Sequence, residues 1–323
     1  MKRAAGACIL GLLVPLLIDI AIAEPWIPTR PVKIIVPFPG GGTNDVLARI
    51  IAERLQAKWN QPVVIENKTG AGGNIGAASA YQSDPDGYTL LLSPPGPLAI
   101  NQSLYKQLAY RPQEFVPLTV VGAVPNAVIV RNELAVSSFQ ALIDYIKARP
   151  GKISFGSQGN GATPHLTAVM FQNMTGTQMV HVPYRGENLV LNDMIGGHVD
   201  VFFGNVAASL APFRDGRVKI LAVADRRRSA LLPEVPTTAE VGLPSLLASG
   251  WFALVAPPNT ERTLASDLAA DAIEVIKLPD VQMRIRAANV EPVGNSSAET
   301  TAFIAEEAQR WGEVIRKNNI VVD

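Results

Sequence analysis

Short apolar runs rich in β-branched residues alternate along this chain with stretches of helical periodicity. The run VKIIVP at residues 32–37 is typical of a buried strand. In residues 45–59, apolar side chains recur at helical spacing, at Val46, Leu47, Ile50, Ile51 and Leu55. Such spacing indicates a helix with one buried face. The alternation predicts an α/β fold with mostly parallel sheets and helices on both faces.

The same alternation continues to the end of the chain. Further strands are expected over residues 62–66, 88–92, 126–131, 152–155, 179–183, 199–203, 218–224 and 252–256. A long amphipathic helix is expected over residues 298–317. A chain of 323 residues with 48% hydrophobic composition is long enough for two domains, each with a core of its own.

The N-terminus has the composition of a secretory signal peptide. Lys2 and Arg3 precede an apolar run that is interrupted only by Asp19 and ends in Ala21-Ile22-Ala23. Small residues at this spacing predict cleavage before Glu24, with residues 1–23 as the signal peptide and a periplasmic location for the rest. A transmembrane anchor is the alternative reading of the same run.

Cysteine and charge exclude several function classes. The only cysteine, Cys8, lies in the predicted signal peptide, so the mature chain has no disulfide and no thiol nucleophile. Of 28 basic and 28 acidic residues, the signal peptide holds two and one, which leaves 26 against 27. A net charge of −1 gives no basic excess for nucleic acid.

A glycine-rich turn follows the first predicted strand, in VPFPGGGTND at residues 36–45. Its glycines allow backbone N–H groups to approach a ligand closely. Asn44 or Asp45 is expected to cap the helix that follows. The N-terminus of that helix favours an anion. The alternative is a plain turn before a capped helix.

A second glycine-rich turn, GSQGNGATPH at residues 156–165, also follows a predicted strand. Thr163 is expected as the N-cap and Pro164 as the first helical residue. Two such helix ends facing each other would hold one anion from both sides. His165 suggests a base or a ligand, but local packing or capping in the first turn is favoured.

Other motifs add a pocket wall and exclude common chemistries. Tyr184 and Phe203 are candidates to wall a pocket. Arg185 is a candidate to neutralise a carboxylate, with an ordinary surface arginine as the alternative. GAGGNIG at residues 70–76 has the wrong spacing for dinucleotide binding. His165, His181 and His198 belong to different motifs, so no metal cluster is expected. No nucleophile elbow, zinc-protease motif or Walker loop is present.

These segments in this order resemble the Bug-type extracytoplasmic solute receptors, the binding subunits of tripartite tricarboxylate transporters. The resemblance covers essentially the whole mature chain. It is carried by RPVKIIVPFPGGGTNDVLARIIAERL, QPVVIENKTGAGGNIGAASA, PDGYTLLLS, ISFGSQGNGATPHLTAVMF, VPYRGENLVLNDMIGGHVDVFFGN, LPEVPTTAEVGLP and EPVGNSSAETTAFIAEEAQRWGEVIRKNNI.

The resemblance implies a two-domain periplasmic binding protein of type II-like fold with a hinged ligand cleft. Residues 24–125 with 250–323 would form domain 1, and residues 126–249 domain 2. The two glycine-rich turns would clamp a ligand carboxylate. The expected ligand-binding residues are Phe38, Gly40, Gly41, Gly42, Thr43, Asn44, Ser157, Asn160, Gly161, Ala162, Thr163, Tyr184, Arg185, Phe203 and Asn205.

Three departures from the family pattern border the expected pocket. Gly40 stands where the family often has a second proline. Gly204 stands where an aspartate is frequent. Glu187 and Asn188 follow Tyr184-Arg185-Gly186, where small residues are usual. These changes could alter which ligand is chosen.

The sequence therefore predicts a non-enzymatic periplasmic receptor for a small carboxylate. It would be a monomer that needs no metal or cofactor, binds no nucleic acid and delivers its ligand to membrane permease subunits. Two alternatives stay open: a ligand-sensing receptor for a membrane signalling partner, and an exported α/β enzyme.

Overall fold

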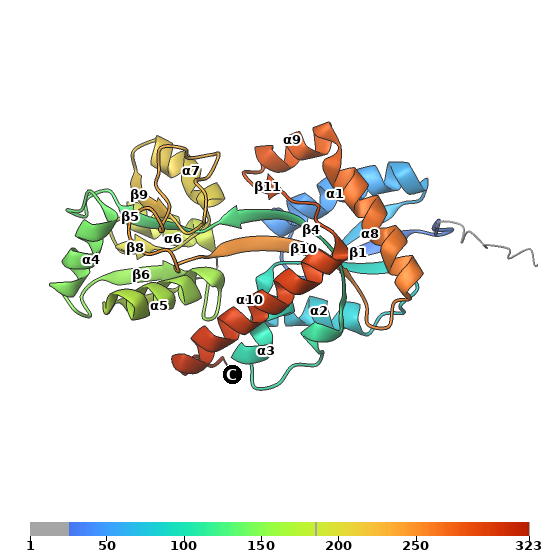
Figure 1. Ribbon diagram of the computed structural model, residues 1–323, viewed down its shortest axis with the longest axis horizontal. Coiled ribbons are helices and arrows are strands. Elements are labelled where there is room, and N and C mark those ends of the chain that lie inside the picture. Colours follow the sequence, from blue (N-terminus) through green and yellow to red (C-terminus); the bar gives the residue numbers. More distant parts are fainter. Residues whose placement is uncertain (1–25, 185, 323) are drawn as a thin grey trace, which may run out of the picture.

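The computed structural model describes residues 26–184 and 186–322 and has two lobes, each built on one sheet (Figure 1). The first sheet has the order β11-β4-β10-β3-β1-β2 and the second β7-β6-β8-β5-β9. The predicted α/β class is confirmed. Among the described residues, no helix is both long and apolar enough to cross a membrane.

The first sheet carries helices on both faces because its strands present apolar side chains on both faces. Its strands are β1 (Val32–Val36), β2 (Val63–Asn67), β3 (Thr89–Ser93), β4 (Val116–Pro125), β10 (Ser249–Ala256) and β11 (Glu291–Pro292). Ile34 packs toward α1 (Thr43–Trp59), α8 (Arg262–Lys277) and α9 (Pro279–Ala287). Ile35 packs toward α2 (Asn74–Tyr81) and α10 (Ser297–Lys317).

Short helical turns connect these elements. They are η1 (Ala71–Gly73), the π-helical turn η2 (Gly96–Ile100), α3 (Asn101–Leu104) and η3 (Pro112–Glu114). The C-terminal helix α10 begins at a capping box, in which Ser296 and Glu299 each accept the other's backbone N–H. It lies across both lobes in Figure 1.

The second sheet is enclosed in the same way. It contains β5 (Ala127–Arg131), β6 (Ser154–Ser157), β7 (Val180–Pro183), β8 (Val201–Phe202) and β9 (Val218–Val223). Residues of α4 (Phe139–Lys147) and α5 (Thr163–Thr175) pack on one face. Residues of α6 (Glu187–Ile195) and α7 (Val206–Arg214) pack on the other.

The expectation of mostly parallel sheets is wrong. β1 pairs in parallel with β2 and β3, and β6 with β7 and β8. All other pairings between two named strands, which involve β4, β5, β9, β10 and β11, are antiparallel. The reason is that β4 ends and β10 begins at the two proposed domain boundaries, and these strands pair with each other in opposite directions.

The two lobes join where β4 leads into β5 and where the chain returns into β10. At this junction the Asn126 N–H donates to the Ala248 carbonyl over 2.9 Å. β4 itself was not predicted, because Pro117, Gly122 and Pro125 interrupt its apolar pattern. The domain boundaries proposed from the sequence stay a prediction.

Candidate functional site

The first glycine-rich turn leads into a helix that has no capping side chain. α1 begins at Thr43, and its N-cap is Gly42. The expectation that Asn44 or Asp45 caps this helix is therefore wrong, since both lie inside its first turn. The first N–H groups of a helix have no partner within it. Without a capping side chain, those of α1 are left for another acceptor.

Asp45 instead holds the turn in shape from behind. Its buried carboxylate accepts the Gly41 N–H over 2.9 Å, the Asn67 side-chain amide over 3.0 Å and two N–H groups of Arg49. The Arg49 guanidinium is the main reason why the pKa of Asp45 is lowered. Gly41 has a φ of +82°, which favours glycine. Its N–H is committed to Asp45 rather than to a ligand.

The second glycine-rich turn has the same construction. α5 begins at Thr163, its N-cap is Ala162, and no side chain caps it. The expected cap at Thr163 is thus wrong by one residue, and Pro164 takes the second helical position. Without a side-chain acceptor, the first N–H groups of α5 are also left for another partner. Asn160 is exposed at the tip of this turn.

Two histidines support the second turn from inside the lobe. His165 Nδ1 accepts the Gly161 N–H over 3.0 Å, and His181 Nε2 lies 2.6 Å from the buried Ser157 hydroxyl. The two imidazoles stack with their centroids 4.1 Å apart, and Phe155 stacks on His181. The favoured reading of His165, local packing and capping, is confirmed.

Burial lowers the pKa of both rings, that of His165 to about 4. A neutral His165 is required for Nδ1 to accept. Sequence reasoning treated His165 and His181 as separate because they are 16 positions apart in different motifs. Parallel pairing of β6 and β7 brings them together. Within residues 26–184 and 186–322, no three His, Cys, Asp or Glu side chains are grouped as metal ligands.

Contacts between the lobes connect the two turns. A Cβ at Gly161 would lie 2.0 Å from Leu104 Cδ2, so α3 packs directly on the second turn. A Cβ at Gly72 would meet the hydroxyl of Tyr105, the residue after α3. A Cβ at Gly73 would lie 3.0 Å from the Phe38 ring of the first turn. These close approaches explain the glycines and place the two turns around one region.

A half-buried glutamate, Glu187, lies at the end of the second sheet that carries the second glycine-rich turn. Glu187 Oε1 accepts the Asn205 N–H over 3.0 Å, and the side chains of Asn205 and Gln158 also donate to this carboxylate. Burial nevertheless raises the pKa of Glu187 to about 7. The sequence singled out Glu187 only as a departure from the family pattern, and Gln158 was missed.

The remaining candidates have different environments. Tyr184 is half-buried and donates its hydroxyl to Asp193 over 2.7 Å. Phe203 is fully buried, and its ring packs 5.1 Å from Phe171, which favours a core role over a pocket wall. A Cβ at Gly204 would collide with the Phe202 ring. Arg185 lies outside the described residues.

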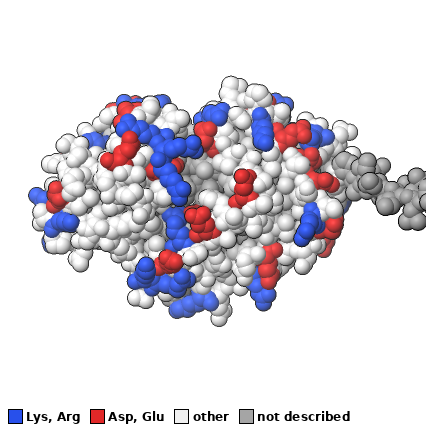
Figure 2. Space-filling view, in the orientation of Figure 1, with Lys and Arg blue, Asp and Glu red and all other residues white. Residues whose placement is uncertain are grey.

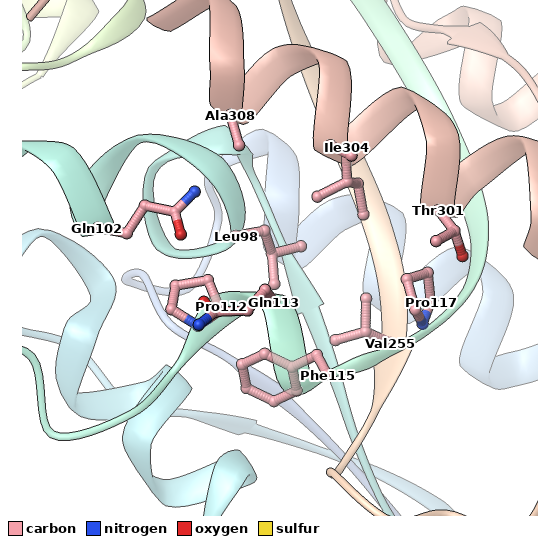
Figure 3. Close-up of a pocket in the computed structure, with 11 residues that line it drawn as sticks. Leu98, Gln102, Pro112, Gln113, Phe115, Pro117, Val255, Thr301, Ile304 and Ala308 are labelled. Atoms are coloured by element: carbon pink, nitrogen blue, oxygen red, sulfur yellow. The ribbon is translucent and has the colours of Figure 1, made fainter. Parts of the chain in front are cut away.

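The surface is hollowed between the lobes, and lysine and arginine side chains follow the hollow on the side of the second lobe (Figure 2). A separate cavity of about 120 Å³ lies between α10, η2 and η3 (Figure 3). Its lining is mainly apolar, with Leu98, Phe115 and Ile304 among its residues. It contains neither glycine-rich turn, so it is distinct from the candidate site.

Residues 47–320 match the sequence model of a protein family, the tripartite tricarboxylate transporter family receptor. This chain belongs to that family. The protein BugT of Bordetella pertussis is 39% identical over 292 residues, which cover 90% of each chain.

Solved structures of other receptors share the fold. Rpa4515 of Rhodopseudomonas palustris with adipate has a TM-score of 0.82 at 34% identity, over 91% of this chain and 99% of that one. MatC of Rhodopseudomonas palustris with bound malate has a TM-score of 0.78 at 27% identity, over 90% and 100%. The expected two-domain fold of periplasmic binding proteins is confirmed, as is the family resemblance.

Proposed function

We propose that this chain is a periplasmic receptor that captures a small organic acid for a tripartite tricarboxylate transporter. The observation that carries the proposal is the pair of helices α1 and α5, both of which begin without a capping side chain after a glycine-rich turn. Backbone N–H groups at helix N-termini bind carboxylates well. Adipate and malate, the acids in the two related structures, support this ligand class.

The proposed mechanism is capture followed by closure of the two lobes. Residues 24–125 with 250–323 and residues 126–249 would move as two domains after removal of residues 1–23. Closure would bring Thr43 and Thr163 to the same carboxylate and remove it from water, which strengthens each hydrogen bond. The closed monomer would then deliver the unchanged ligand to the membrane permease subunits.

A ligand panel tests this function. Purified protein is heated with mono- and dicarboxylates, and with amines, sugars and nucleotides as the comparison. A matching acid at about 100 times its Kd is expected to stabilise the fold by about 2.7 kcal/mol. A protein that ignored every carboxylate and responded to another class would contradict the proposal.

Two variants and a matched control locate the site. Thr43→Ala and Thr163→Ala are expected to weaken the stabilisation. Thr301→Ala makes the same chemical change in the separate cavity of Figure 3 and is expected to leave it unchanged. If only Thr301→Ala weakened binding, the acid would bind in that cavity instead.

A further inference from the structure

Three neighbouring strands of the second sheet end at one carboxyl group. β6 lies between β7 and β8 and is parallel to both. Gln158, Glu187 and Asn205 follow β6, β7 and β8 respectively along the chain. Parallel strands present their carboxyl ends at one edge, and ligands of α/β proteins bind beyond that edge. The Glu187 carboxyl therefore belongs to the ligand-binding edge of the second lobe.

The Glu187 carboxylate has acceptor capacity to spare. It receives the backbone and side-chain N–H groups of Asn205 and the side chain of Gln158. A carboxylate offers about four acceptor positions. Glu187 is also partly exposed rather than sealed in the core. Among the residues that the structure describes, no donor fills the remaining position, which can accept a hydrogen bond from a group outside the chain.

Buried amide oxygens near the two turns and the lobe junction add to this excess of acceptors. No described residue donates to Oδ1 of Asn44, Asn126 or Asn205. Their orientations are fixed, because the Asn44 amide nitrogen donates to the Leu92 carbonyl and that of Asn126 to the Thr167 hydroxyl. The Asn205 side chain donates to Glu187. An unpaired buried acceptor is costly, so these oxygens favour donors from a ligand or water.

We propose that Glu187 selects acids that carry a hydroxyl or ammonium group in addition to their carboxylate. The carboxylate would bind at the helix N-termini of α1 and α5, and the donor group would bind Glu187. A plain diacid of the same length would leave the Glu187 acceptor unmatched and bring a second negative charge toward it. This inference rests on the proposed function and assigns the chemistry of its second anchor.

Matched ligands test this assignment by calorimetry at pH 8, where Glu187 is mainly ionised. Succinate, malate and aspartate differ only in a hydrogen, a hydroxyl or an ammonium group, and propionate, lactate and alanine repeat the series with one carboxylate. We expect at least one donor-bearing acid to bind the wild-type protein about tenfold or more tightly than its plain counterpart. The two series separate the hydroxyl from the ammonium source.

Glu187→Gln removes the charge with little change of shape, and Glu234→Gln makes the same change at an exposed glutamate of the second lobe. We expect the preference to shrink to within about threefold in the first variant and to persist in the second. Equal binding of plain and donor-bearing acids by the wild type would overturn the assignment, as would an unchanged preference in Glu187→Gln. Binding of no carboxylate at all would instead defeat the proposed function.

Discussion

Asp45 shows how a residue that need not touch the ligand can shape a binding turn. Its carboxylate joins the Gly41 amide to Asn67 of the next strand and to Arg49 one helical turn further on. The turn is therefore shaped by a charge from behind, while the helix N-terminus in front of it has no side-chain cap.

Asp45→Ala should disturb both the turn and the fold. The Gly41 N–H and the Asn67 amide lose an acceptor, at a cost of ~1–3 kcal/mol. We expect denaturant unfolding to report this loss and ligand affinity to fall with it. Asp84→Asn, at an exposed aspartate, is the control and should change stability by less than about 0.5 kcal/mol. Unchanged affinity in Asp45→Ala would contradict the supporting role.

His165 makes stability depend on pH. Its pKa is lowered to about 4 in the folded protein, against about 6.5 in an unfolded chain. The unfolded state therefore binds more protons between these values. The contribution of a neutral His165 to the free energy of unfolding is therefore fully present above pH 6.5. It is lost as the pH falls toward 4, and the total loss is on the order of 3 kcal/mol.

Denaturant unfolding between pH 4 and 7.5 measures this effect. Asn can place its side-chain oxygen near the position of Nδ1, so His165→Asn should keep the acceptor for Gly161 and flatten the pH dependence. His198→Asn, at an exposed histidine, should leave it as in the wild type. A His165→Asn protein with the full wild-type slope would refute the assignment.

At the scale of elements, the buried carboxylate of Glu307 links α10 to the lobe junction by hydrogen bonds. Glu307 Oε2 accepts both indole N–H groups of Trp251 and Trp311 over 3.0 Å, while Oε1 receives Arg310. Arg310 also donates to the Leu247 carbonyl, just before β10. One carboxylate thus ties helix α10 to a strand that leads between the lobes.

Glu307→Ala should be among the more destabilising changes in this chain. It would leave two buried indole N–H groups and a guanidinium without their acceptor, and we expect a loss of about 3 kcal/mol. The neighbouring Glu306 is exposed, so Glu306→Ala is the matched control and should be close to neutral. Thermal unfolding of both variants measures the difference. Similar melting temperatures of the two variants would show that the hydrogen bonds of Glu307 contribute little to stability.

Elements were predictable where their signal is local. β1, α1 and α10 are confirmed close to their predicted bounds, because a strand of β-branched residues or a helix with one apolar face is visible within a few positions. β4 was missed because its prolines and glycine obscure that signal. The antiparallel pairing of β4 with β10 joins positions more than a hundred residues apart, which no local pattern reports.

The candidate site could likewise be predicted from the sequence only in part. Both glycine-rich turns were visible in the sequence, but the absence of capping side chains was not, because Asn44, Asp45 and Thr163 are all good capping residues. The bond from Asn205 to Glu187 spans 18 positions. This hydrogen bond forms only because β6, β7 and β8 lie side by side. The sequence therefore indicated Glu187 as unusual but did not indicate Asn205 as its hydrogen-bond partner.

At the scale of the whole molecule, binding should be visible in tryptophan emission. Trp251 and Trp311 lie at the lobe junction, whereas Trp26 and Trp59 pack against each other beside α8 of the first lobe. A Trp26→Phe, Trp59→Phe double variant keeps only the junction pair. We expect a bound acid to shift the emission of this variant if the lobes close.

A further variant tests whether the emission change comes from the junction pair. A Trp311→Phe protein should lose part of the signal while it keeps its affinity, because Trp311 is fully buried and is not one of the expected ligand-binding residues. Binding that calorimetry detects and that leaves the emission of the junction pair unchanged would argue against closure through this region.

The far end of α10 has a mechanical consequence. Ile315 packs into the core of the second lobe and Asn318 accepts from Asn173 of α5, while the Val322 N–H donates back to Leu104 of α3 in the first lobe. Two connecting strands alone would allow the lobes both to swing and to twist. Helix α10, which lies across both lobes in Figure 1, is a third attachment away from those strands and should oppose twisting. We therefore expect a motion with a single degree of freedom, in which the two turns meet in the same register at every closure.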